Sequence, residues 1–182
     1  MLDPFPFAAP AALQHATQPL ADFLSLPTLP LHIHEVLFAI TLYSIIDIWI
    51  SPRLSAILCP NTYPRLDKRT TINWNVHVVS LFQSLIICAV ALYVIIFDEE
   101  RRGMNWAGRI WGYTGASGLL QAFATGYFIW DFTVTITHFD IFGFGLLAHA
   151  VSALAVFMLG FVSCLLSFSP SSLAHAAVLP DE

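Results

Sequence analysis

The chain has 182 residues, of which 57% are hydrophobic and only 10% are charged, against about 25% charged residues in an ordinary soluble domain. This composition leaves too little polar surface to cover a water-soluble globule, so it predicts an all-α, polytopic integral membrane protein. The net charge of −5, with 7 Lys and Arg residues, offers no basic face for a phosphate backbone, and nucleic acid is therefore excluded as a partner.

Metal sites and cofactors are not indicated by the sequence. The 3 cysteines form no Cys-x-x-Cys pair, and Cys88 lies in an apolar run where a thiol packs as a small hydrophobic group. His32 and His34 are two residues apart, so on a helix they point in different directions. Glu35 is expected to complement the positive end of its helix. We therefore expect no metal ion and no cofactor.

Residues 1–30 are rich in proline and contain no long apolar run, which is typical of a flexible N-terminal tail rather than a signal peptide. The first span is expected at about 31–50, because Ser51 and Pro52 should end its helix. A loop with several basic residues follows to about residue 70. Asp47, at the end of this span, is expected to reach Arg53 or the lipid headgroups.

Three more apolar windows of the length needed to cross a bilayer follow, at about 76–97, 115–137 and 145–168. We therefore expect about four transmembrane helices, the last three forming one partial domain over 71–168, and a second tail at 169–182. The window at 115–137 is less hydrophobic than the others. Gly118, Ala122 and Gly126 recur there every four residues, as in close helix packing in lipid. This stripe should face protein, either within the chain or in a homo- or hetero-oligomer.

Ionisable residues inside these windows are the candidate site. Asp131 lies about 9 Å from one end of its span and His149 about 6 Å from the adjoining end of the next, and a short connection makes the two helices antiparallel. His77 and Gln83 begin their span on the same side, and Tyr127 shares a helical face with Asp131. We expect Asp131, His149, Tyr127, His77 and Gln83 to line a lipid-binding cavity, because polar groups in lipid need partners.

Structural roles are the alternative for each of these residues. Asp131 also suits an interhelical hydrogen bond, and His149 is equally suited to packing. His77 and Gln83 stand near a span end, where interfacial groups are common. His138 and Asp140 are expected in a solvated loop.

Three segments in order, "INWNVHVVSLFQSLI" (72–86), "GYFIWD" (126–131) and "HFDIFGFGLLAHAVSAL" (138–154), resemble the TLC domain (TRAM, LAG1 and CLN8 homology), especially fungal members similar to transmembrane protein 56. The resemblance implies a multispan protein of the endoplasmic reticulum concerned with lipids. It also implies further spans beyond residue 168, so we expect a C-terminally truncated member.

In the enzymatic branch of that family, the ceramide synthases, the resemblance implies a His-His pair and later aspartates. His149 matches the first histidine and is the candidate catalytic residue, but Ala150 stands at the second position. Three functions follow. The first is lipid binding or sensing in lipid homeostasis, without catalysis. The second is acyl-CoA-dependent N-acyl transfer with His149 as general base. The third is proton-coupled transport through Asp131 and His149.

Overall fold

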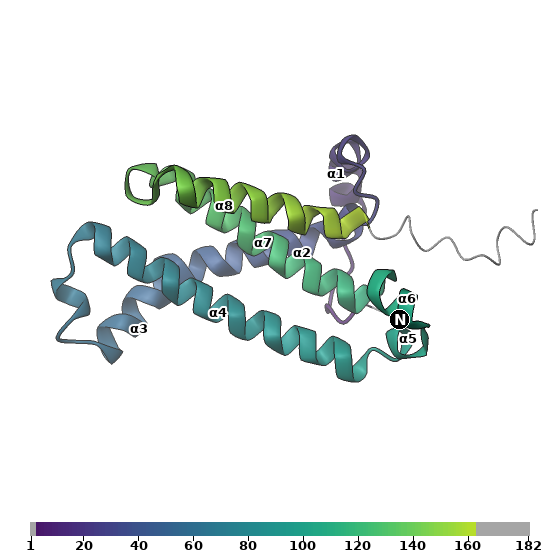
Figure 1. The fold of residues 1–182 in the computed structure, drawn as a ribbon, viewed down its shortest axis with the longest axis horizontal. Coiled ribbons are helices and arrows are strands. Elements are labelled where there is room, and N and C mark those ends of the chain that lie inside the picture. The colour runs from purple at the N-terminus through teal and green to yellow at the C-terminus, as the bar shows by residue number, and fades with distance from the viewer. Residues whose placement is uncertain (1–2, 163–182) are drawn as a thin grey trace, which may run out of the picture.

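The computed structural model describes residues 3–162, and these residues form helices with no strand among them (Figure 1). In chain order the elements are α1 (Ala11–Leu24), α2 (Leu29–Ile45), the π-helix η1 (Ile46–Ile50), α3 (Ser51–Leu58), the 3-10 helix η2 (Tyr63–Arg65), α4 (Lys68–Phe97), α5 (Glu99–Gly103), α6 (Trp106–Trp111), α7 (Gly115–Thr137) and α8 (Phe139–Leu159). The all-α prediction is confirmed. The end of the fourth expected span and the tail at 169–182 lie outside the described residues.

Helix α7 has the bounds expected for the third span and is the central helix of the bundle. It packs against α2, α4 and α8 (Figure 1). A reciprocal cap sets its start: the Ser117 backbone N–H donates to Thr114 Oγ1 at 3.2 Å, and the Thr114 N–H donates to Ser117 Oγ at 3.0 Å. These bonds satisfy backbone donors that have no partner inside the helix. The buried end of α7 thus begins at a defined residue.

The prediction that Pro52 ends the first span is wrong. Helical structure continues through η1 and α3, so that the apolar segment runs over Leu29–Leu58. The Ser51 N–H donates to the carbonyl of Ile46, five residues back. This wider turn gives room for the proline ring, and Pro52 falls in the first turn of α3.

The N-terminal tail was also predicted incorrectly over residues 11–24, which form α1. The turn after α1 packs Leu26 among Ala21, Leu29 and Phe161. The Thr28 hydroxyl donates to the Phe161 carbonyl at 2.8 Å, which ties this turn to the end of α8. Prolines and short apolar runs make this helix difficult to recognise from the sequence, and it packs mainly against α2, the next helix along the chain.

Helices α4 and α8 begin earlier than expected. Asp67 sits at the start of α4, and its carboxylate accepts hydrogen bonds from Arg69 N, Thr70 N and Thr70 Oγ1. These bonds, first of all the one from the Thr70 side chain, hold the pKa of Asp67 below its usual value. Helix α8 begins directly after His138, and only Gly143, with φ of 70°, interrupts its first turns. The expected loop at 138–144 is therefore mostly helical.

Three helical segments are long and apolar enough to cross a membrane: Leu29–Leu58, Lys68–Phe97 and Phe139–Val162. Their outer faces expose large apolar side chains, which suits contact with lipid. On α4 and α8 these include Leu81, Leu85, Leu92, Ile95, Phe144, Leu146, Val156 and Leu159. Together the helices form an integral membrane bundle. Helix α7 is less apolar because it is surrounded by protein, and its crossing of the bilayer stays a prediction.

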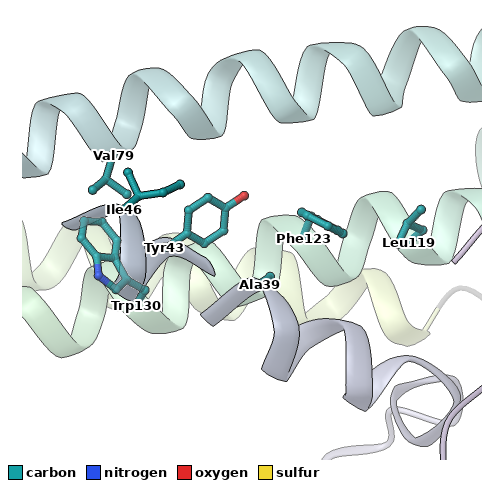
Figure 2. Packing of buried hydrophobic residues seen from close by; sticks show 7 residues of the cluster. All are labelled: Ala39, Tyr43, Ile46, Val79, Leu119, Phe123 and Trp130. Atoms are coloured by element: carbon teal, nitrogen blue, oxygen red, sulfur yellow. The ribbon is translucent and has the colours of Figure 1, made fainter. Parts of the chain in front are cut away.

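The main apolar core lies where α2, η1, α4 and α7 meet. Figure 2 shows Tyr43 and Ile46 packed between Val79 of α4 and Trp130 of α7. Ala39, Leu119 and Phe123 extend this core along α7. Small and large side chains alternate across the interface, so α2 and α7 approach closely on one side while aromatic rings fill the other.

The stripe of small residues on α7 faces protein, as expected, and that protein is α2 of the same chain. A Cβ atom on Gly126 would lie 2.5 Å from Ala39 Cβ and 2.9 Å from the Val36 carbonyl oxygen. A Cβ atom on Gly118 would lie 2.2 Å from His32 Nε2, and Ala122 is fully buried. Since α2 covers the stripe, it offers no open surface to a second chain. Oligomerisation stays a prediction.

Gly126→Ala is expected to lower the free energy of unfolding by about 1–3 kcal/mol, because the new methyl group overlaps α2 and the backbone must shift. The measurement is unfolding of the purified protein in mixed micelles. Gly145→Ala is the matched control, because a Cβ atom there meets nothing within 4 Å. Equal effects of the two substitutions would contradict the close packing of α7 on α2.

Candidate functional site

Four polar side chains from three helices form a hydrogen-bonded group inside the bundle, which we call the tyrosine cluster: Tyr43, Ser80, Gln83 and Tyr127. The Tyr43 hydroxyl donates to Gln83 Oε1, joining α2 to α4. The Tyr127 hydroxyl and Ser80 Oγ lie 2.9 Å apart, joining α7 to α4. Ser80 already donates to the Val76 carbonyl at 2.9 Å, so Tyr127 is the donor in this pair.

The two phenol rings of the tyrosine cluster also contact each other. Their centroids are 5.5 Å apart at an interplanar angle of 81°. This edge-to-face arrangement is energetically favourable for aromatic rings. Tyr43 is fully buried, and Gln83 is 8% exposed. Because lipid offers no hydrogen bonds, these pairs satisfy polar groups that would otherwise be costly within the membrane.

Asp131 lies one helical turn beyond Tyr127 on α7 and connects the tyrosine cluster to α8. It is half-buried and within electrostatic range of both Tyr127 and His149. His149 is exposed on the outer surface of α8. Asp131 and His149 therefore interact electrostatically across the α7–α8 hairpin, and their role as a functional pair stays a prediction. The pair extends from the bundle interior to the surface that faces lipid.

Of the five candidate site residues, His77 is the one that the structure leaves outside this arrangement. Its side chain is exposed on α4, and its Nδ1 bonds the Asn73 carbonyl of its own helix at 2.7 Å. Gln83, one and a half turns further along α4, is buried and bonded to Tyr43. Sequence reasoning did not identify Tyr43 or Ser80, because neither lies on the helix of Asp131, whose face singled out Tyr127.

Asp47 and His138 form a smaller group at the same end of the bundle. They interact electrostatically and line a cavity of about 200 Å³ with Asn75 and Val134. Contrary to expectation, Asp47 does not reach Arg53. Arg53 instead donates a hydrogen bond to the Trp49 carbonyl at 3.0 Å, and its guanidinium carbon lies 4.9 Å from the centre of the Trp49 indole ring. Cation–π contact and the backbone bond hold it at the interface.

A larger cavity of about 330 Å³ lies at the other end, between α4, α7 and the end of α8. Its lining is mostly apolar, with Val94 and Ile95 on α4 and Phe161 after α8, while Arg101 and Gln121 supply polar groups. The Gln121 amide donates to the Phe157 carbonyl and joins α7 to α8. None of the five predicted site residues lines this cavity.

Sequence reasoning also missed a second buried polar group, at the start of α2. His32 and Glu35 are 1% and 0% exposed, and they are joined by a hydrogen bond of 2.9 Å. Contrary to expectation, Glu35 does not complement the positive end of its helix, because α2 begins at Leu29 and Glu35 lies beyond its first turn. The spacing of three residues between His32 and Glu35 was the available signal, since residues at i and i+3 share a helical face.

Tyr43→Phe is expected to lower the free energy of unfolding by about 1–3 kcal/mol, because it leaves the buried Gln83 carbonyl without its donor. Tyr93→Phe is the control, since Tyr93 is on the outer face of α4 and 37% exposed; a change within about 0.5 kcal/mol is expected there. Unfolding in mixed micelles measures both. Equal losses would show that the bond between α2 and α4 contributes nothing.

Comparison with known proteins assigns the chain to a family. The model of the TLC domain matches residues 73–172. An uncharacterised TLC domain-containing protein of Schizosaccharomyces pombe is 32% identical over 94% of this chain and 57% of its own length. Topoisomerase I damage affected protein 4 of Saccharomyces cerevisiae is 27% identical over 70% of this chain and 44% of its own length.

Human TLC domain-containing protein 4 is 28% identical over 64% of this chain and 42% of its own length. The chain thus spans about half the length of the curated relatives it matches. No solved structure matches it. The matched residues include most of α4 and all of α7 and α8, and they carry the whole candidate site except Tyr43 of α2. The chain belongs to the TLC domain family.

Proposed function

We propose that the chain is a membrane protein of lipid homeostasis that binds a membrane lipid and has no catalytic activity of its own. The observation that carries this proposal is the placement of His149 and Asp131. An imidazole exposed on the apolar outer surface of α8 meets hydrocarbon, in which it has no hydrogen-bonding partner. A lipid with a hydroxyl, amide or phosphate group near that depth supplies the missing partner.

Asp131 gives the proposed site its specificity for a polar lipid group. Its carboxylate lies within electrostatic range of His149 and of the Tyr127 hydroxyl, and the tyrosine cluster fixes Tyr127 through Ser80. A lipid donor bound between α7 and α8 then meets a carboxylate acceptor and an imidazole together. Hydrogen bonds to charged groups contribute about 1.5–3 kcal/mol, which suffices to select such a lipid over a purely apolar one.

The resemblance to ceramide synthases does not favour catalysis in this chain. The position after His149 holds Ala150, which is 0% exposed and has no group for proton transfer. A single histidine exposed to lipid has one carboxylate nearby and no second imidazole beside it in sequence. Lipid binding requires only the groups that are present. Localisation to the endoplasmic reticulum is part of this proposal and agrees with lipid handling.

Asp131→Leu is expected to weaken labelling by a photoactivatable ceramide or phospholipid about tenfold, the equivalent of 1.4 kcal/mol, because the carboxylate that holds the polar group is lost. Labelling of the purified protein in lipid vesicles, mapped by mass spectrometry, measures it. Asp140→Leu is the control, since Asp140 is exposed at the start of α8.

Unchanged labelling of the Asp131→Leu protein would exclude this site. A second measurement separates binding from catalysis: transfer of a labelled acyl group from CoA to sphinganine in microsomes is expected to be absent. Transfer that is present and is abolished by His149→Ala would replace the proposal with N-acyl transfer.

A further inference from the structure

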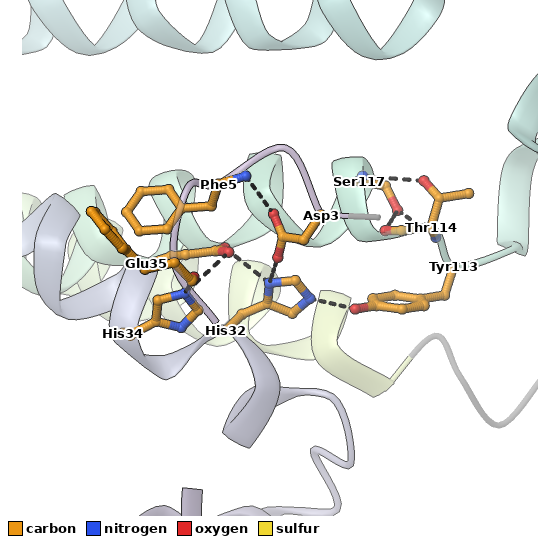
Figure 3. Close-up of polar contacts among 9 residues, drawn as sticks. Asp3, Phe5, His32, His34, Glu35, Tyr113, Thr114 and Ser117 are labelled. Atoms are coloured by element: carbon orange, nitrogen blue, oxygen red, sulfur yellow. Dashed lines mark hydrogen bonds and ion pairs between the residues drawn. The ribbon is translucent and has the colours of Figure 1, made fainter. Parts of the chain in front are cut away.

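A buried group of acidic and imidazole side chains lies where the N-terminal segment crosses the start of α2, at the other end of α2 from Asp47. Figure 3 shows Asp3 and Glu35 pointing toward one nitrogen of His32, while Tyr113 approaches the other nitrogen. His32 Nδ1 lies 2.9 Å from Glu35 Oε2 and 3.4 Å from Asp3 Oδ2. We call Asp3, His32 and Glu35 the Asp3 cluster.

The Asp3 cluster holds two carboxylates with little to neutralise them. Within residues 3–162, its ion pairs involve only histidines, His32 and the more distant His34 at 3.7 Å from Glu35 Oε1. Neighbouring carboxylates do not both ionise readily without a cation between them. Glu35 is fully buried, so its charge is also poorly solvated.

One carboxylate oxygen of Glu35 makes no hydrogen bond within residues 3–162. Oε1 is buried and has no hydrogen-bond partner in the described part of the chain. A buried carboxylate oxygen left in this state is costly, because it has lost its hydration without gaining a partner. The Glu35 side chain is directed into the cluster. A bound cation would balance the negative charge of the carboxylates and give this oxygen a partner.

The positions of the polar atoms suit a metal ion. One oxygen each from Asp3 and Glu35 and one nitrogen from His32 lie within 4.8 Å of one another. Zinc bonds of about 2.0–2.2 Å to nitrogen and oxygen require ligand atoms somewhat closer, at about 3–3.5 Å. The 3.4 Å separation of His32 Nδ1 and Asp3 Oδ2 already lies in that range.

Tyr113 orients the imidazole for such coordination. His32 Nε2 is hydrogen-bonded to the Tyr113 hydroxyl, which accepts from the ring when Nε2 carries the proton. In that tautomer Nδ1 presents its lone pair to the two carboxylates. A ligating histidine that donates its other N–H to a fixed acceptor is the usual arrangement around zinc.

We propose that Asp3, His32 and Glu35 bind a divalent transition-metal ion, with zinc the best match. One imidazole and two carboxylates fit zinc better than calcium, which prefers oxygen ligands alone. A cavity of about 430 Å³, lined by Asp3, His32 and Tyr113 among others, provides room for water at a fourth position. The ion joins the N-terminal segment to α2, and this inference is independent of the proposed lipid site.

Without a metal ion, the same residues form only a buried group joined by the contacts between His32 and the two acids, which we call the ion triad. The two states respond differently to zinc. In the metal site, zinc binds with defined stoichiometry and stabilises the folded chain, because it binds the native state preferentially. In the ion triad, zinc does not bind with a defined stoichiometry and does not stabilise the folded chain.

The test uses the full chain, purified in detergent through a tag that contains no histidine and stripped of metal with EDTA. After incubation with zinc chloride and desalting, elemental analysis is expected to find about one zinc per chain, and thermal melting is expected to shift upward. Asp3→Asn and Glu35→Gln should bind zinc at least tenfold more weakly. Asp140→Asn and Glu99→Gln, exposed acids elsewhere, should bind it as the unmodified chain does.

Asp3→Asn is the decisive variant, because Asp3 is 31% exposed and its replacement leaves the bundle core intact. Its elution profile and melting temperature without zinc should equal those of the unmodified chain. The proposal is overturned if the unmodified chain retains no zinc after desalting, or if Asp3→Asn retains it with equal affinity.

Discussion

The close approach of α7 to α2 is the contact on which the rest of the molecule depends. Gly126 lets the α7 backbone approach that of α2, and Gly118 leaves room for the His32 ring, where a Cβ atom at either position would clash. The same contact positions both polar groups of the bundle. Gly118 lies against the His32 ring, while Gly126 precedes Tyr127 and faces Ala39, one turn before Tyr43. Small residues in α7 thus determine where polar groups meet.

The membrane explains why the polar groups have these partners. Helices α4 and α8 turn large apolar side chains outward, and interhelical association in lipid gains little from burying more of them. Hydrogen bonds between helices and tight backbone packing therefore carry more of the specificity. Tyr43 with Gln83 and Tyr127 with Ser80 connect α4 to its two neighbours. His149 is exposed on the apolar outer face of α8, and the proposed lipid would give its imidazole a partner.

Much of this arrangement could be predicted from the sequence, because hydropathy and depth follow from counting residues. The bounds of α7 and the proximity of Asp131 to His149 came from such counting, since a hairpin forces adjoining ends to one level. The TLC family was identified from ordered motifs within α4, α7 and α8. The stripe at Gly118, Ala122 and Gly126 was recognised as a packing surface, although its partner proved to be α2.

Other features depend on contacts between distant segments and left no local signal. Asp3 and Tyr113 are brought to His32 by the fold, so the sequence offered only the spacing of His32 and Glu35. The turn after α1 is joined to the end of α8. The end of the first span was predicted incorrectly at Pro52 because a π-helical turn accommodates this proline. Hydropathy contains no information on the geometry of helical turns. Sequence therefore identified the ionisable residues but not the groups of partners around them.

Oxidative crosslinking of Ala39→Cys with Gly126→Cys, in a chain whose native cysteines are replaced by serine or alanine, tests the packing of α2 on α7 directly. A disulfide needs Cβ atoms about 3.5–4.5 Å apart, which these positions reach with a shift of about one ångström in the helices. An intramolecular disulfide in most of the membrane-embedded protein is expected, with Gly145→Cys in place of Gly126→Cys giving none. Disulfide-linked dimers, or no crosslink in a protein that elutes normally, would contradict the arrangement.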